Sequence, residues 1–116
     1  MIKQIQILQV NEKAENSRYI MFSGLEMLEH LGLSLSHDTY KQVYEGQHVT
    51  SSEDVNDILD ELFADFNLRR PKEFKGHSLS TSDIVKMDGK YYYCDDYGWA
   101  EMKLRYTDNG WSYIKA

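Results

Sequence analysis

Hydrophobic residues recur at helical spacing in one long segment of the chain and at every second position through most of its C-terminal half. The helical segment is predicted to run from about Ser52 to Phe66, with Ser51 or Ser52 as its cap, and Pro71 prevents its continuation. The apolar face of this helix comprises Val55, Ile58, Leu59, Leu62, Phe63 and Phe66. Such a face is expected to be buried against another element.

The segment after Pro71 has the alternating pattern of half-buried strands, which we predict at residues 84–87, 90–95, 99–104 and 111–114. The joints between them are Asp88-Gly89, Asp96-Tyr97-Gly98 and Asn109-Gly110. The first and last joints are dipeptides that supply positive φ in tight hairpin turns. The four strands therefore form an antiparallel meander, and we expect the main helix to pack on its tyrosine-rich part.

The N-terminal third is predicted to hold one strand, at residues 3–10, followed by a polar loop at 11–16. Ser23 and Glu26 fit a capping box, which opens a short helix that ends at Gly32. A further strand is expected over residues 39–45, ended by Gly46. The predicted fold class is therefore α+β, an antiparallel β-meander sheet packed against one main amphipathic helix and a shorter N-terminal helix.

The chain has 116 residues, the usual length of one domain, so we predict a single domain over residues 1–116. Its single cysteine, Cys94, cannot form an internal disulfide, and no leader-like pattern opens the chain. Together these features predict a cytoplasmic location. No apolar run approaches the roughly 20 residues that a membrane-spanning helix needs, so we expect no membrane insertion.

The net charge of −6 is unevenly distributed along the chain. Between residues 11 and 66, twelve carboxylates stand against three lysines and arginines, whereas the cations slightly outnumber the acids from residue 67 onward. An acidic half repels phosphate backbones and attracts basic protein surfaces. The charge therefore favours a protein partner and disfavours direct contact with nucleic acid.

Two charged clusters are candidate binding surfaces. The acidic cluster follows the predicted main helix at steps of three, four and four residues, opposite its core side, and consists of Asp54, Asp57, Glu61 and Asp65. It is either a solvated helix face or the contact surface for a basic partner. The alternative is a surface for single-stranded nucleic acid, built from a basic loop and from aromatic rings that stack on bases. Its residues are Arg69, Arg70, Lys72 and Lys75 beside Phe74, with Tyr91, Tyr93, Tyr97 and Trp99.

His77 beside Ser78, with Asp83 nearby, has the residue types of a hydrolytic triad. Adjacent residues of an extended turn point in different directions, and no nucleophile elbow or oxyanion site accompanies them. We therefore interpret residues 76–83 as a structured turn closed by Asp83 or Ser80, in which His77 is partly buried and hydrogen-bonds across the loop.

Cys94 is followed by Asp95 and Asp96, which favour the neutral thiol, so we expect a buried strand cysteine. The four histidines show neither paired-cysteine nor His-Glu-x-x-His spacing; they are His30, His37, His48 and His77. We therefore predict no catalytic residue, no metal site and no cofactor.

Several separated motifs occur in one order along the chain. They are Tyr-x-x-Val-Tyr at 40–44, Phe-Asn at 66–67, Pro-x-x-Phe at 71–74, Gly-His-Ser-Leu-Ser-x-Ser-Asp-Ile-Val at 76–85, Asp-Gly-Lys-x-Tyr-Tyr at 88–93 and Tyr-Gly-Trp at 97–99. In these motifs the chain resembles the YodL-like domain family, which recurs in proteins of Gram-positive mobile elements and phages. The resemblance covers the chain from Tyr40 to about Met102, is loose in the N-terminal third, and leaves residues 105–116 as an addition.

The resemblance implies no catalytic residues. Together with the acidic helix face, it leads us to expect a non-enzymatic, protein-binding module of a phage or mobile element. Such a module would cover a surface on a host or defence protein, in the manner of an anti-CRISPR or anti-restriction inhibitor.

Overall fold

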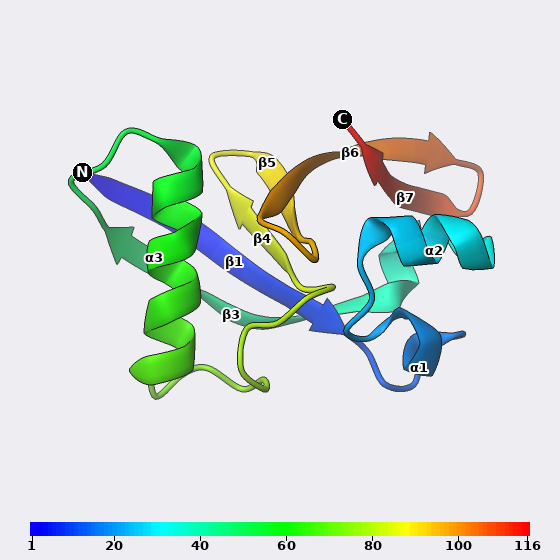
Figure 1. Cartoon of the computed structure of the whole chain (residues 1–116), viewed down its shortest axis with the longest axis horizontal. Coiled ribbons are helices and arrows are strands. Elements are labelled where there is room, and N and C mark those ends of the chain that lie inside the picture. The colour runs from blue at the N-terminus through cyan, green and yellow to red at the C-terminus, as the bar shows by residue number, and fades with distance from the viewer.

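The computed structural model describes all residues from Met1 to Ala116 and contains one curled, seven-stranded antiparallel sheet (Figure 1). The helices are α1 (Ser17–Ile20), α2 (Leu25–Leu31) and α3 (Val55–Leu68), with a short 3-10 helix at His37–Thr39. The strands are β1 (Ile2–Val10), β2 (Leu35–Ser36), β3 (Tyr40–Val49), β4 (Ile84–Met87), β5 (Lys90–Cys94), β6 (Trp99–Thr107) and β7 (Gly110–Lys115). The strand order in the sheet is β2-β7-β6-β5-β4-β1-β3. The predicted α+β class and the meander from β4 to β7 are confirmed.

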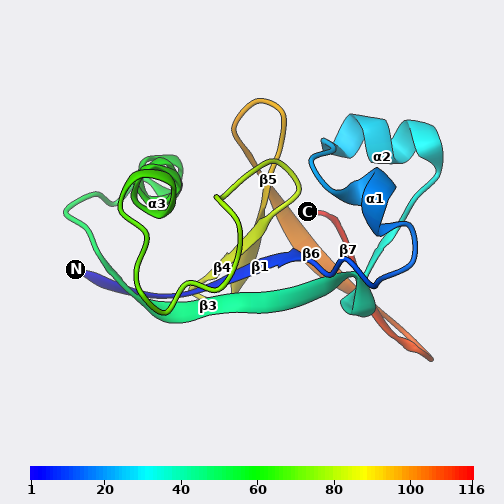
Figure 2. The ribbon, with the colours of Figure 1, turned by 90° about the horizontal axis from the view of Figure 1, so that it is seen from below.

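The helices lie in two groups at opposite ends of the molecule (Figure 1). Figure 2 shows α3 above one end of β1 and β3, the α1–α2 pair above the other end, and β5 rising between them. The sheet therefore has two separate hydrophobic clusters, one under each group of helices.

Neighbouring positions of the β4–β5 hairpin point into different clusters. Val85 and its cross-strand partner Tyr92 belong to the cluster under α3, together with Ile58, Leu59, Leu62 and Phe66 of that helix. Ile84 and its partner Tyr93 belong to the other cluster, with Ile20 of α1 and Leu28 of α2. Because side chains alternate along a strand, both faces of this hairpin are covered. Only Tyr92 of the tyrosine run packs in the cluster of α3, which otherwise rests on β1, β3 and β4.

The start of α2 differs from the prediction. Ser23 and Glu26 form no capping box, because Gly24 is the N-cap and the Ser23 hydroxyl donates to the carbonyl of Tyr19 at 2.8 Å. The first free amide of the helix, on Leu25, instead donates to Asp95 Oδ1 at 2.9 Å. The cap is therefore supplied from the loop between β5 and β6, which local sequence does not indicate.

The main helix begins later than predicted and is capped by a different residue. Asp54 is the N-cap, and its Oδ1 accepts a hydrogen bond from the Asp57 amide at 3.1 Å, so the predicted serine cap is wrong. Val55 and Phe63 lie at the margins of the helix face and are 39% and 38% exposed. The buried face of α3 is therefore narrower than its apolar spacing indicates.

Two glycine predictions are corrected. Gly46 does not end β3, because pairing with β1 continues to Val49. The missing side chain of Gly46 leaves room for the Tyr44 ring to lie over the strand. Asp88-Gly89 forms the expected turn with positive φ at both residues. In the last hairpin, Thr107 pairs with Gly110, so the loop is Asp108-Asn109 and lies one residue earlier than predicted.

Candidate functional site

The acidic row, defined as Asp54, Asp57, Glu61 and Asp65, lies along one flank of α3. The structure places this row next to β3 rather than opposite the core, because His48 of β3 contacts two of its members. The Nε2–H of His48 donates to Glu61 Oε1 at 2.8 Å, and His48 Nδ1 lies 3.8 Å from Asp65 Oδ2. The predicted residues therefore share one flank, and that flank borders the outermost strand of the sheet.

Contacts within the acidic row divide it into engaged and free carboxylates. Asp54 caps the helix, and Asp65 Oδ1 pairs with Arg69 at 2.7 Å. Hydrogen bonding by His48, and then by Thr50, holds the pKa of the Glu61 carboxyl below its ordinary value. Asp57 is exposed, and its carboxylate makes no contact of this kind. Asp57 is therefore the member of the acidic row that is free to pair with a cation of another molecule.

The predicted basic surface is less available than its sequence indicates. Arg69 is paired with Asp65, and Arg70 donates to the Ser78 hydroxyl and lies over the Phe74 ring at 5.8 Å. Lys72 and Lys75 are exposed, and the Lys75 amide donates to the carbonyl of Val43 at 3.1 Å, which fastens the loop to β3. Two of the four cations are therefore already engaged within the protein.

The rings predicted as stacking faces do not form one surface. Tyr93 is fully buried, and Tyr91 packs edge-on against Tyr113. Trp99 packs against the cluster under α3, and its Nε1–H lies 3.3 Å from Asp60 Oδ1. Only Tyr97 is free, at 98% exposed. A continuous aromatic platform for bases is therefore not present on this sheet.

The turn at residues 76–83 is closed, as predicted, by Ser80 and Asp83. The backbone N–H of Ser80 donates a hydrogen bond to Asp83 Oδ2 at 2.8 Å. Its third partner, Gln9 of β1, was not identified by sequence reasoning. The Gln9 side-chain amide donates to the His77 carbonyl at 2.9 Å and to Asp83 Oδ2 at 3.0 Å, and its Oε1 accepts from the His77 amide. The signal in the sequence was Gln9 itself, a polar residue between Leu8 and Val10 in the predicted strand.

The residues of the suspected triad do not face one another. His77 Nδ1 lies 2.7 Å from the carbonyl oxygen of Ser78, while the Ser78 hydroxyl accepts from Arg70. Burial raises the pKa of the Asp83 carboxyl to about 7, although hydrogen bonds from Ser80 and Gln9 favour its charged form. This arrangement holds a turn in place and does not pair a base with a nucleophile.

Cys94 is buried at the end of β5, as predicted. Burial, and then the nearby carboxylates of Asp83 and Asp95, raises the pKa of its thiol to about 12. The protonated thiol is a poor nucleophile and a poor metal ligand. No three His, Cys, Asp or Glu side chains gather in a way that could hold a metal ion.

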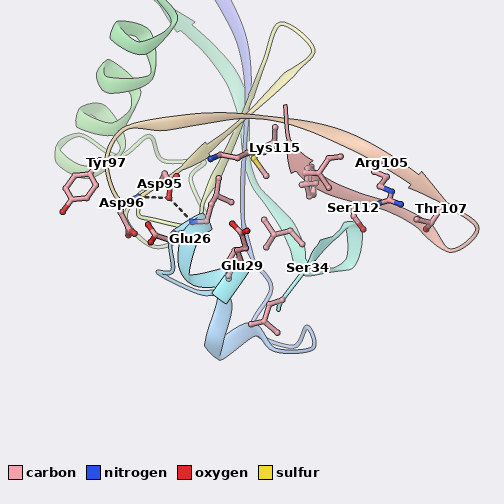
Figure 3. A pocket seen from close by; sticks show the side chains of 17 residues that line it. Glu26, Glu29, Ser34, Asp95, Asp96, Tyr97, Arg105, Thr107, Ser112 and Lys115 are labelled. Carbon is pink, nitrogen blue, oxygen red and sulfur yellow. Dashed lines mark hydrogen bonds between the residues drawn. The ribbon is translucent and has the colours of Figure 1, made fainter. Parts of the chain in front are cut away.

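A cleft of about 730 Å³ lies between α2 and the β6–β7 hairpin, and sequence reasoning did not identify it. Its floor is apolar and includes Leu28, Leu35, Met102 and Tyr113. Figure 3 shows Glu26, Asp95 and Asp96 at one end, and Arg105 with Ser112 at the other. Lys115 lies beside the acidic end in the same view, and Glu29 lies between the two ends, so the rim of the cleft carries charges of both signs.

The sequence profile of the YodL-like domain family matches residues 4–104, and the chain belongs to this family. The match begins in β1, so it covers the N-terminal third more fully than the motifs indicate, and it ends in β6, before the turn to β7. Comparison with curated proteins and with solved structures gives no match. None of the helices is long and apolar enough to cross a membrane.

Proposed function

We propose that this protein is a non-enzymatic binding module that contacts a basic surface of another protein through the acidic row of α3. The observation that carries the proposal is the alignment of Asp54, Asp57, Glu61 and Asp65 on one flank of a helix, at the open edge of the sheet. In its sharpest form, the module is encoded by a phage or mobile element and inhibits a host or defence protein. We propose an inhibitor of the anti-CRISPR or anti-restriction type.

Charge supports this proposal in two ways. Ionised acids along a helix flank raise the rate at which a basic partner arrives in the correct orientation. The same charge repels the phosphate backbone of nucleic acid, and half of the cations in the basic loop are engaged internally. An acidic flank of this kind fits a protein surface that itself binds nucleic acid.

Paired charge reversals on two helices test the proposal. The test variant carries Asp57→Lys with Glu61→Lys on α3. Its matched control carries Glu26→Lys with Glu29→Lys on α2, which makes the same change in net charge at exposed positions beside the cleft. The partner is captured from the host lysate, identified and purified, and its affinity is measured for each form. We expect a large loss for the α3 variant alone. A loss confined to the α2 variant would move the contact surface to the cleft.

A further inference from the structure

We propose that the free edge of β3, from Glu45 to Val49, accepts an extended segment of the partner as an added strand, with lysine or arginine at alternate positions of that segment. The inference rests on the proposed function, because it describes how a basic partner sits beside the acidic row. It goes beyond that function by naming the backbone groups that bind and the pattern that they recognise.

The pairing of β1 with β3 shows which backbone groups are free. Met1 and Thr50 exchange both of their hydrogen bonds, at 2.9 and 2.7 Å. Bonded and non-bonded pairs alternate along an antiparallel ladder, and the register is regular from there to the Ile7–Tyr44 pair. The N–H and C=O groups that point away from β1 therefore belong to Glu45, Gln47 and Val49.

These outward groups have no partner in the protein. β3 is the last strand of the sheet and pairs only with β1. The loop after α3 reaches this edge only at Val43, where the Lys75 amide binds. Glu45, Gln47 and Val49 are exposed, and neither proline nor lysine protects the edge between them. In Figure 2, β3 runs beneath β1 and β4, with α3 above its end. The open register is thus about five residues long.

The acidic row determines what kind of segment fits. His48 points to the α3 side of the sheet, and its contacts with Glu61 and Asp65 place those carboxylates directly above β3. A strand added beside β3 lies about 4.8 Å further out, with alternate side chains on each face. The side chains on its α3 face come next to Asp57, Glu61 and Asp65. Cationic residues at every second position complement these acids, and backbone pairing supplies the rest of the affinity.

A second copy of the chain fits this edge poorly. Two copies whose β3 edges pair in antiparallel fashion are related by a two-fold axis perpendicular to the sheet. This symmetry puts both α3 helices on the same face of the joined sheet. The two acidic rows then lie opposite each other across the new ladder. Repulsion between like charges opposes this arrangement, whereas a basic segment relieves it.

The test uses a seven-residue peptide of alternating lysine and threonine with blocked ends, and it follows the exchange of single amides with deuterium by NMR. We expect the peptide to slow exchange at Glu45, Gln47 and Val49 by about tenfold or more, because these amides gain hydrogen-bond acceptors. The amides of Gly46 and His48 point to β1 and serve as internal controls, since their exchange stays unchanged.

Two N-methylated forms of the peptide separate strand pairing from charge attraction. Only alternate amides of an added strand face β3, so methylation of one set must abolish binding and methylation of the other set must not. Gln47→Pro removes one outward N–H, leaves the ladder with β1 intact, and should weaken peptide binding about tenfold relative to Gln47→Thr.

Three results would overturn the inference. They are absence of binding, binding without protection of the three outward amides, and an equal effect of both methylated peptides, which would show attraction to the acidic row alone. Protection that appears without peptide and grows with protein concentration would also contradict it, because a second copy would then occupy the edge. The proposed function fails on a separate result, namely unchanged affinity for the purified partner after charge reversal on α3.

Discussion

The side-chain amide of Gln9 donates a hydrogen bond of 3.0 Å to Asp83 Oδ2 and so ties β1 to the turn that precedes β4. Both residues are almost fully buried, and the other carboxylate oxygen, Oδ1, has no hydrogen-bond partner. Burial of a charged carboxylate with one unpaired oxygen costs desolvation free energy. This contact joins two segments that lie 74 residues apart. The burial of Asp83, which raises the pKa of its carboxyl, makes the stability of the fold depend on the protonation of this group.

The first prediction concerns the pH dependence of stability. Burial raises the pKa of Asp83 from its ordinary value of 3.8 to about 7. Between these values the folded protein holds a proton that the unfolded chain has released, so the contribution of this group to stability falls as pH rises from 3.8 to about 7. The change is on the order of a few kcal/mol. Below and above this range the contribution is constant.

Asp83→Asn removes this titration and keeps an oxygen that accepts from Ser80 and Gln9. We expect the variant to gain stability relative to the parent protein as the pH is raised from 4 to 8. Urea unfolding of both proteins at several pH values measures the difference between their free energies of unfolding. The titration of all other groups cancels in this difference. Asp96→Asn, at an exposed carboxylate, serves as the control and should show no such trend. A constant difference between Asp83→Asn and the parent would contradict the prediction.

Packing under α3 gives the second prediction. Leu62 is fully buried in the cluster that joins α3 to β1, β3 and β4, so Leu62→Ala should lower the free energy of unfolding by about 2 to 5 kcal/mol. Phe63→Ala is the control, because Phe63 is 38% exposed and its truncation leaves little cavity. Chemical denaturation measures both values. A loss below about half a kcal/mol at Leu62 would show that this face of α3 is not part of the core.

Cysteine reactivity provides the third prediction. Because the pKa of Cys94 is raised to about 12, the thiol stays protonated near neutral pH and the folded protein should react with iodoacetamide far more slowly than the urea-unfolded chain. Mass spectrometry of the alkylated protein over time measures this ratio. Equal rates in the two states would mean that the end of β5 opens freely.

The fold could be predicted from the sequence where local pattern and final burial agree. The spacing from Val55 to Phe66 indicated α3, and Asp88-Gly89 indicated the hairpin of β4 and β5. The prediction failed where a distant residue decides the local structure. Asp95 caps α2 from another loop, and pairing with β1 carries β3 past Gly46 to Val49. The division into two clusters was also missed, because Tyr92 and Tyr93 look alike in sequence and differ only in which face of the hairpin they occupy.

Prediction of the candidate site from the sequence failed for the same reason, namely contacts between distant residues. The acidic row was visible because its spacing follows one helix flank. Its neighbour was not, since His48 lies on a strand that pairs with β1, and only the packing of α3 across that strand brings the imidazole to Glu61. The apolar floor of the cleft likewise combines α2 with β6 and β7, whose proximity depends on the curl of the sheet.

The most direct test of the central claim is the association rate of the purified partner at low and high ionic strength. For the parent protein and the Glu26→Lys, Glu29→Lys control, association should slow steeply as salt is added, because opposite charges guide the encounter. With Asp57→Lys and Glu61→Lys, association at low salt should fall about tenfold or more and lose most of its salt dependence, while circular dichroism shows an intact fold. If this variant associates as fast as the parent and with the same salt dependence, the acidic row of α3 is only a solvated face and the proposed function is wrong.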